Sequence, residues 1–288
     1  MVINMELSMN VEYLKKQRGT SDQRDIMACA KIVKEAGFDY VDFAFYNHSY
    51  IASESWRTNI ERILEGFNKI GVIVDQAHAP FVHAGLDEDV YKEYMRRGFE
   101  GAHILGANHI VIHGDKYKRE EDTLDSVKAL NDTYDFYAPY VEYAKKIGLG
   151  VAIENVPERS VRPHTWYTAR VEEQIELIEK FNDPIVTACW DFGHGMLSYA
   201  EDHIDALKKI GPYLTCTHVH DNHRGVSGDL HMTPFFGKCE WEDVMAVLKE
   251  IKYKGKFTFE MVYGTFPDAL VGDYMKFLHR IGEYLVSL

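Results

Sequence analysis

Short apolar segments alternate with segments of helical periodicity along the whole chain. The strands that this pattern predicts are Val2–Leu7, Tyr40–Phe43, Val72–Gln76, His109–Ile112, Gly150–Ile153, Ile185–Trp190, Leu214–Thr217 and Lys256–Phe259. Alternation of short buried strands with helices is typical of a parallel sheet. Eight such units within 288 residues predict an α/β fold of one architecture, a closed (β/α)8 TIM barrel.

Helices are predicted between these strands wherever apolar residues recur at helical spacing. Their expected bounds are Glu54–Ile70, Val90–Leu105, Leu124–Ile147, Val171–Phe181, Glu201–Ile210 and Ala269–Val286, with one more helix through Ile26, Ala30 and Val33 and another beginning at Glu240. We expect Ser21 and Asp22 to cap the first helix. Gly71, Gly106 and Gly148 are expected to end three others.

We expect a single TIM-barrel domain over residues 1–288, because no linker-like, low-complexity or Pro-rich segment separates the units. Barrels of this length are commonly one domain. An open doubly wound sheet is the alternative α/β architecture. That architecture often carries a Gly-rich phosphate-binding turn after its first strand, and no such turn follows Leu7. The barrel is therefore favoured.

Charge and apolar content narrow the class of protein. A net charge of −13 disfavours nucleic acid as a partner, because a general nucleic-acid or anionic-membrane binder presents a basic face. No run of about 18 apolar residues could span a membrane, and Met1–Glu6 lacks the basic start of a secretory signal. The cysteines, Cys29, Cys189, Cys216 and Cys239, show no C-x-x-C spacing. We expect reduced thiols and a cytoplasmic protein.

Histidines and acidic residues follow the ends of six predicted strands. They are His78, His113, Glu154, Asp191 with His194, His218, and Glu260. Because the active site of a (β/α)8 barrel lies at the carboxyl ends of its strands, these side chains should meet at one face. The histidine-rich segment Thr217–His231 adds Asp229 and His231. Imidazole and carboxylate suit zinc, manganese and related ions, so the pattern predicts a metal site.

Taken singly, these residues also have structural explanations. His78 and His113 could bond backbone groups at a strand end, and Thr217–His231 could be a surface loop. Glu154 and Glu260 could form ion pairs with Lys or Arg. A carboxylate directly after an apolar strand is costly unless something positive compensates it. The recurrence of such residues at most strand ends favours the metal site.

Other side chains near the strand ends allow two interpretations. Aromatic residues could separate a substrate from water or belong to the rim of the core; they are Phe43, Phe45, Tyr46, Trp190 and Trp241. Glu158, Arg159 and Arg162 could cover the site or grip a phosphate, or they could be exposed loop charges. Neither alternative is resolved by the sequence.

Five short motifs accompany the later strands: Ile-Glu-Asn-Val (153–156), Trp-Asp-Phe-Gly-His (190–194), His-Val-His-Asp-Asn (218–222), Asp-Leu-His (229–231) and Phe-Glu (259–260). With these motifs the chain resembles the xylose-isomerase-like barrels over essentially its whole length. That superfamily includes sugar and sugar-phosphate isomerases and epimerases, and also endonuclease IV. The motifs are specific for the superfamily and not for a substrate.

Resemblance to the epimerase-like members implies one divalent metal ion, Mn, Zn, Co or Mg, held by Glu154, Asp191, His218 and Glu260. It also implies that His194 and Arg224 contact substrate oxygens. The expected activity is isomerisation or epimerisation of a small sugar or sugar phosphate. Glu154 and Glu260 would be the catalytic residues that transfer protons through an enediolate, with the metal as Lewis acid. A homodimer or homotetramer is expected from the resemblance alone.

Two alternative functions remain. Endonuclease IV resembles this chain at more positions, and its three-zinc cluster would map onto His78, His113, Glu154, Asp191, His194, His218, Asp229, His231 and Glu260. The flanking motifs favour a sugar enzyme, since His218 is followed by Val-His-Asp-Asn rather than the nuclease's Leu-Asn-Asp-Ser. A non-catalytic sugar-binding barrel is the other alternative. It is disfavoured because none of the ligand positions is lost.

Overall fold

Eight parallel strands form a barrel in the computed structural model of the chain, which describes residues 5–15, 24–46, 48–81, 86–114, 124–158, 164–224, 228–261 and 266–288. The strands are β1 (Leu7–Asn10), β2 (Tyr40–Ala44), β3 (Ile73–His78), β4 (His109–His113), β5 (Gly150–Glu154), β6 (Val186–Asp191), β7 (Leu214–His218) and β8 (Phe257–Phe259). Their hydrogen-bonded order is β7-β6-β5-β4-β3-β2-β1-β8.

The ring closes beside Val219, the residue after β7. Val219 N donates to Thr258 O at 2.7 Å, and Glu260 N donates to Val219 O at 3.1 Å. This parallel bridge joins the two ends of the strand order. The predicted (β/α)8 barrel is confirmed.

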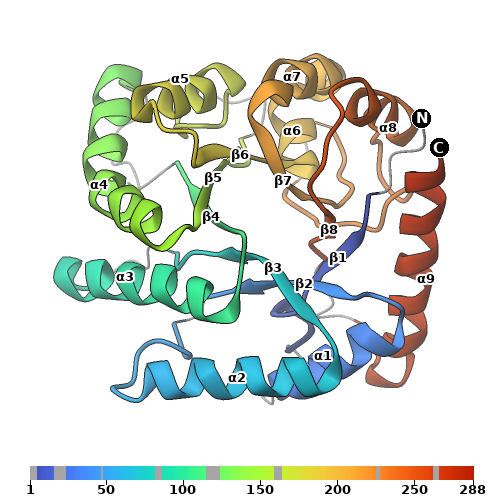
Figure 1. Cartoon of the computed structure of the whole chain (residues 1–288). Coiled ribbons are helices and arrows are strands. Elements are labelled where there is room, and N and C mark those ends of the chain that lie inside the picture. The colour runs from blue at the N-terminus through green and yellow to red at the C-terminus, as the bar shows by residue number, and fades with distance from the viewer. Residues whose placement is uncertain are drawn as a thin grey trace.

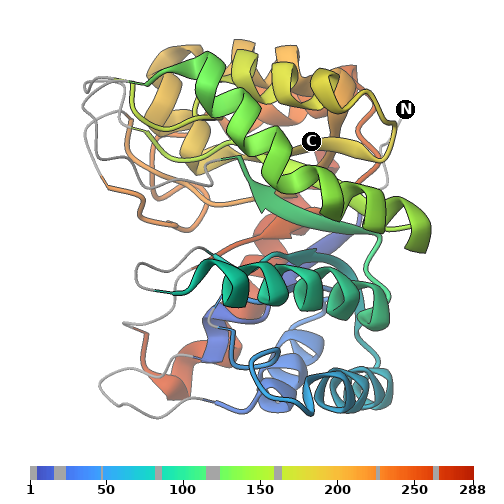
Figure 2. The same ribbon diagram turned by 90° about the vertical axis from the view of Figure 1, so that its left-hand side faces the viewer.

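A ring of helices encloses the barrel (Figure 1). The helices are α1 (Ile26–Glu35), α2 (Trp56–Ile70), α3 (Glu88–Leu105), α4 (Ser126–Ile147), α5 (Val171–Phe181), α6 (Phe192–Tyr199), α7 (His203–Ile210), α8 (Trp241–Glu250) and α9 (Asp268–Ser287), with short 3-10 turns at Tyr13–Lys15, Ala200–Asp202 and Gly211–Tyr213. In Figure 2, α3 and α4 cross the side of the barrel that faces the viewer. The main apolar core, which includes Phe43, Ile112 and Phe257, lies between strands and helices. None of the described helices combines the length and apolarity needed to cross a membrane.

Three helices end at glycines, as predicted. Gly71, Gly106 and Gly148 follow α2, α3 and α4, with φ of 85°, 83° and 72°. Glycine adopts this left-handed conformation without the steric cost of a Cβ atom. The helix α5 has the predicted bounds, and most other elements differ from the prediction only at their ends.

The first strand is misplaced in the prediction. Instead of Val2–Leu7, β1 runs from Leu7 to Asn10, and residues 1–4 lie outside the described part of the chain. Alternation explains the error: Met9 points to the main core, whereas Ser8 and Asn10 are polar and buried. A search for a continuous apolar run does not find such a strand.

Two helices, α1 and α6, also differ from the prediction. The Asp25 side chain caps α1 by accepting a hydrogen bond from Met27 N at 3.0 Å; the predicted cap at Ser21 and Asp22 lies outside the described residues. The short helix α6 was not predicted, because Phe-Gly-His-Gly after Asp191 resembles a turn. Capping by Asp191 stabilises this helix despite its two glycines.

The barrel interior below the strand ends has an apolar half and a polar half. On β4 to β7 the inward-facing residues form a small apolar cluster, separate from the main core: Val111, Ala152, Cys189 and Cys216. On β1, β2, β3 and β8 the corresponding residues are polar and almost fully buried: Ser8, Asn10, Asp42, Gln76 and Thr258. The pairing of β2 with β3 skips one residue, so that Gln76 lies beside Asp42.

Candidate metal centre

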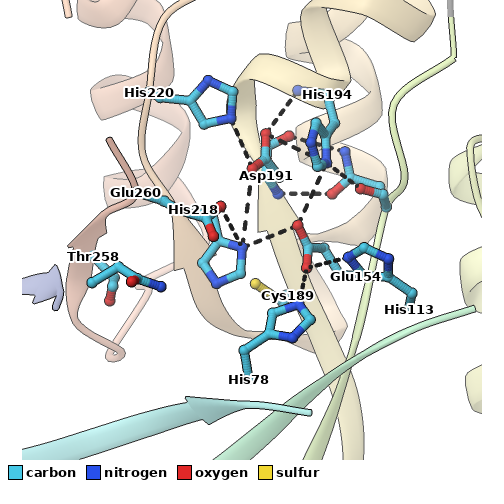
Figure 3. Close-up of polar contacts among 12 residues, drawn as sticks. His78, His113, Glu154, Cys189, Asp191, His194, His218, His220, Thr258 and Glu260 are labelled. Atoms are coloured by element: carbon cyan, nitrogen blue, oxygen red, sulfur yellow. Dashed lines mark hydrogen bonds and ion pairs between the residues drawn. The ribbon is translucent and has the colours of Figure 1, made fainter. Parts of the chain in front are cut away.

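The predicted metal ligands, together with His220, lie in three groups at the carboxyl end of the barrel. The central group consists of Glu154, Asp191, His218 and Glu260; a second consists of His78, His113 and Glu154; a third consists of His194, His220, Asp229 and His231. Within each group, one potential ligand atom per residue lies within 4.8 Å of all the others. Figure 3 shows Glu154, Asp191 and His218 pointing toward one another at the centre. Strands far apart in sequence thus supply one continuous cluster.

His218 lies at the middle of the central group. Its Nδ1 atom is 3.0 Å from Glu154 Oε1, 3.4 Å from Glu260 Oε2 and 4.0 Å from Asp191 Oδ2. All four side chains are almost completely buried. Three carboxylates and an imidazole in such proximity, shielded from water, form a donor set that suits one divalent cation.

Glu154 is shared with the second group. Its Oε2 atom lies 3.2 Å from His78 Nε2 and 3.4 Å from His113 Nε2. His78 is buried, whereas the His113 side chain is 25% exposed. Glu154 can therefore bridge two sites, one through each carboxylate oxygen.

The third group adjoins the central group through Asp191. His220 Nε2 lies 2.9 Å from Asp191 Oδ2. Asp229 Oδ2 lies 3.2 Å from His194 Nε2 and 2.9 Å from His231 Nε2. Asp229 is 27% exposed, so this group reaches the solvent side of the cluster.

Backbone carbonyls fix the ring orientation of three of these histidines. The bonds run from Nδ1 of His78 to Ala79 O (2.8 Å), from Nδ1 of His194 to Asn155 O (2.8 Å) and from Nδ1 of His231 to Glu260 O (2.9 Å). A carbonyl oxygen only accepts hydrogen bonds, so Nδ1 carries a proton in each ring.

This orientation makes each remaining nitrogen, Nε2, face a carboxylate oxygen. If the ring is neutral, Nε2 presents a lone pair to that oxygen, and two electron-rich atoms repel each other. The arrangement is stable if the ring takes up a second proton or if a cation lies between the two atoms. Histidines that bind metals characteristically donate their other ring N–H to a carbonyl or carboxylate. The residues present therefore fit a divalent metal ion.

The charges of the cluster are strongly coupled. Burial alone would raise the pKa of Glu154, but His218, His113 and His78 lower it well below its ordinary value. Burial opposes a charge on His194, yet Asp191 and Asp229 raise its pKa well above the ordinary value. Burial likewise opposes the charge on His231, and Asp229 raises that pKa to about 9. The pKa values of Asp191 and Asp229 are lowered as well, so these two carboxylates and Glu154 are held ionised, the form that binds cations.

Asn155 aligns the end of β6 with the end of β5. Its Nδ2 group donates to Asp191 O at 2.9 Å, and its Oδ1 atom accepts from Asp191 N at 2.7 Å. Asp191 Oδ1 in turn accepts from His194 N. Because Asp191 caps α6, the first turn of that helix brings His194 back to the cluster.

Asp221 organises the loop that carries Asp229 and His231. Its fully buried carboxylate accepts four hydrogen bonds, from Asn222 N, Cys239 N, Phe235 N and Trp241 Nε1, at 2.8 to 3.0 Å. Gly237 packs so closely that a Cβ atom there would lie 2.2 Å from Asp221 Oδ1. This one buried side chain therefore joins parts of the loop on both sides of His231.

The predicted substrate contact Arg224 lies beside two glutamates. Its guanidinium is 3.1 Å from Glu201 and also pairs with Glu240, and neither glutamate belongs to the three groups. Its contact with a substrate stays a prediction.

Of the aromatic residues considered for the substrate wall, four are buried in the core. Phe43, Phe45, Trp190 and Trp241 are fully buried. Tyr46 differs, because its O–H donates to Glu260 Oε1. Its ring stacks on Phe81 at a centroid distance of 4.5 Å. Only Tyr46 among the five is in direct contact with the cluster in the described structure.

Glu158 is not an exposed loop charge. It is buried, and its side chain pairs with His164. His164 Nε2 also lies 2.7 Å from Glu173 Oε1. Arg159 and Arg162 lie outside the described residues.

Two residues of this site, His220 and Asp42, were not predicted from the sequence. His220 lies two positions after His218, a spacing that could have suggested the same face of an extended segment. Asp42 lies inside the barrel with Oδ2 3.6 Å from His218 Nε2. No motif near Asp42 pointed to this contact, which joins β2 to β7.

The family model for the xylose isomerase-like TIM barrel matches residues 30–281, so the chain belongs to this family. Among curated relatives, the uncharacterized protein y4fM of Sinorhizobium fredii is 21% identical over 256 residues, covering 80% of this chain and 78% of that one. The uncharacterized protein MJ1311 of Methanocaldococcus jannaschii is 25% identical over 236 residues, covering 79% and 76%.

Solved structures of similar fold include sugar epimerases. A D-tagatose 3-epimerase-like protein has a TM-score of 0.74 at 21% identity, covering 98% of both chains. A D-psicose 3-epimerase in the presence of D-fructose has a TM-score of 0.72 at 15% identity, covering 99% and 100%. The IOLI protein with a bound zinc atom has a TM-score of 0.75 at 17% identity, covering 98% of both. These identities establish a shared fold.

Proposed function

We propose that the protein is a divalent-metal-dependent isomerase or epimerase of a small sugar or sugar phosphate. The observation that carries the proposal is the convergence of Glu154, Asp191, His218 and Glu260 at the mouth of the barrel. Sugar epimerases share this fold. The ring orientations of His78, His194 and His231 support the presence of a cation in the cluster.

The four residues of the central group would hold the metal ion. When bound, a divalent ion supplies Lewis acidity toward the carbonyl and hydroxyl oxygens of a sugar. His194, at the edge of the central group, would contact a substrate oxygen, as the family resemblance implies.

Glu154 and Glu260 are the candidate acid and base. They come from β5 and from the end of β8, and they flank His218. Burial opposes the charge on Glu154, but the neighbouring histidines lower its pKa and keep this carboxylate ionised, the form that both a base and a metal ligand require. Tyr46 holds Glu260 by a hydrogen bond to Oε1. One carboxylate would take the proton from the carbon beside the carbonyl, and the other would return one.

The test compares Glu154→Gln and Glu260→Gln with the wild type on a panel of ketoses and their phosphates, beginning with D-tagatose, D-psicose and D-fructose. Turnover and exchange of the substrate carbon-bound hydrogen with deuterated water are measured. We expect each variant to lose about 10³-fold or more, because acid–base groups contribute about 10²–10⁴ and the same side chains bind the metal. The control is Glu179→Gln, whose side chain contacts Tyr213 on the surface. Near-normal turnover in both site variants would refute the proposal.

A second candidate function is favoured by the second and third groups. Three adjoining groups around Glu154 and Asp191 could hold three ions rather than one. A chain that binds close to three zinc ions and cleaves a duplex at an abasic site would be an endonuclease IV-like nuclease. Elemental analysis of protein purified without added metal separates the two: about one exchangeable ion per chain supports the epimerase.

A further inference from the structure

We propose that Asp42 is a positioning residue that fixes the ring of His218, so that Nδ1 of His218 is free to bind the metal. This inference rests on the proposed metal-dependent function. It concerns a residue outside the three ligand groups, from a strand that contributes no ligand to any of them.

Asp42 is a fully buried carboxylate in the polar half of the barrel. Its Oδ2 atom accepts a hydrogen bond from Asn10 Nδ2 at 3.0 Å and lies 3.6 Å from His218 Nε2. Within the described residues, neither Asp42 Oδ1 nor His218 Nε2 has a hydrogen-bond partner. A buried carboxylate oxygen and a buried ring nitrogen that lack partners are each costly, and the Asp42 carboxylate lies beside this nitrogen of His218.

His218 has carboxylates on both of its ring nitrogens. Nδ1 faces Glu154 and Glu260, and Nε2 faces Asp42. A neutral imidazole carries one N–H. If that proton is on Nε2 and is donated to Asp42, the lone pair of Nδ1 points into the central group, which is the orientation that a metal ligand requires.

The other histidines in the cluster support this assignment by contrast. His78, His194 and His231 donate Nδ1–H to backbone carbonyls and present Nε2 to the cluster. His218 is turned the other way, and no carbonyl bond is formed by its ring among the described residues. Asp42 takes the place of the carbonyl. A carboxylate is a stronger acceptor than a carbonyl, so it also makes the imidazole a better electron donor.

Asp42 is itself held by a network that reaches a second ligand. Asn10 Nδ2 lies 3.3 Å from Tyr46 Oη in addition to its bond with Asp42. Tyr46 donates to Glu260. Asn10 therefore links the group that orients His218 to the group that orients Glu260, and the polar half of the barrel positions two ligands of the central group.

The test measures zinc and manganese affinity of the full-length chain by titration against a competing chelator. We expect Asp42→Asn to weaken binding about 10- to 100-fold, the usual effect of removing a partner of a metal ligand. The melting temperature of the metal-free protein should change little. The matched control, Asp75→Asn on β3, removes a carboxylate that bonds Asn108, outside the ligand groups, and should change affinity less than twofold.

A second measurement needs no variant. In the zinc-loaded wild type, long-range proton–nitrogen NMR spectra report which ring nitrogen of His218 carries the proton. We expect Nε2–H; an Nδ1–H tautomer would overturn the inference, as would equal affinity of Asp42→Asn and the wild type. These results would leave the proposed function intact. A wild-type chain that binds no divalent ion would instead overturn both.

Discussion

The two halves of the barrel interior differ in what they do for the ligands above them. Below Glu154, Asp191 and His218, the apolar half on β4 to β7 fills space with small side chains such as Val111 and Ala152. The polar half supplies Asp42, which lies 3.6 Å from His218 Nε2, and Asn10, which contacts the Tyr46 hydroxyl that donates to Glu260. Asp191, which lies over the apolar half, is oriented by Asn155 at the end of β5. The apolar half fills the barrel interior, whereas the polar half is connected through Asp42 and Asn10 to two ligands of the central group.

The largest loss of metal affinity should come from substitution of Glu154, which lies above the apolar half. Because it belongs to two ligand groups, Glu154→Gln should reduce bound metal more than Glu260→Gln, which affects one group. We expect a loss of affinity beyond the 10- to 100-fold typical of residues that contact only a ligand. Elemental analysis after dialysis measures it. Equal metal content in the two variants would contradict the bridging role of Glu154.

A large effect is also expected from Asp221, which holds the loop beyond β7. Asp221→Asn should lower the free energy of unfolding by about 3 kcal/mol. The side-chain NH2 group replaces one carboxylate oxygen, so the two N–H donors bonded to that oxygen lose their acceptor. Chemical denaturation measures this change, and limited proteolysis should show faster cleavage near Asp229. The exposed Asp243→Asn on α8 is the control. If both variants behave alike, the loop does not depend on Asp221.

His164 lies between the carboxylates of Glu158 and Glu173, outside the three ligand groups. Hydrogen bonds to Glu158 and Glu173 raise the pKa of His164 to about 9, above its ordinary 6.5. A raised folded-state pKa stabilises the protein fully below pH 6.5, and this contribution is lost as the pH rises through about 9. His164→Gln should therefore cost about 2 kcal/mol at pH 6 and much less at pH 10, since hydrogen bonds to charged groups are worth about 1.5–3 kcal/mol.

Thermal unfolding of the wild type and of His164→Gln between pH 6 and pH 10 measures the difference in their stability. A difference that stays constant with pH would mean that His164 does not titrate in this way. Added zinc should leave the difference unchanged, in contrast to variants of His218.

The smallest loss of stability should come from a substitution in the apolar half. Cys216→Ala removes one sulfur atom from a packed cluster and should cost about 1 kcal/mol of stability through the cavity it leaves. Metal affinity should match that of the wild type. Denaturant unfolding and the chelator titration measure the two quantities. A tenfold loss of affinity in Cys216→Ala would remove the distinction between the two halves.

Most of the fold could be predicted from local patterns. Helical periodicity and the terminal glycines marked α2, α3 and α4, and apolar runs marked most strands. The prediction was wrong where polar residues face inward, as in β1, and where a side-chain cap stabilises a glycine-containing helix, as in α6. In both cases the deciding residues are polar, so a search for apolar runs and apolar periodicity does not register them.

Part of the candidate site could also be predicted from the sequence, and part could not. Histidines and carboxylates after successive strands could be recognised in the sequence, because the ends of parallel strands share one edge of a barrel. The contacts of Asp42 and Tyr46 could not be predicted, because each is made with a residue far along the chain, His218 or Glu260. His220 carried a weak signal, its spacing from His218.

The sequence by itself determined the architecture and the kinds of ligand atoms, since both follow from short-range periodicity and from residue type. Only the tertiary structure decided which nitrogen of each histidine faces the cluster and which buried groups hold it there. The physical reason is that closure of the barrel brings β2 across from β7 and joins β7 to β8. Distances of a few ångströms between such strands are set by strand register and packing, and no local pattern encodes them.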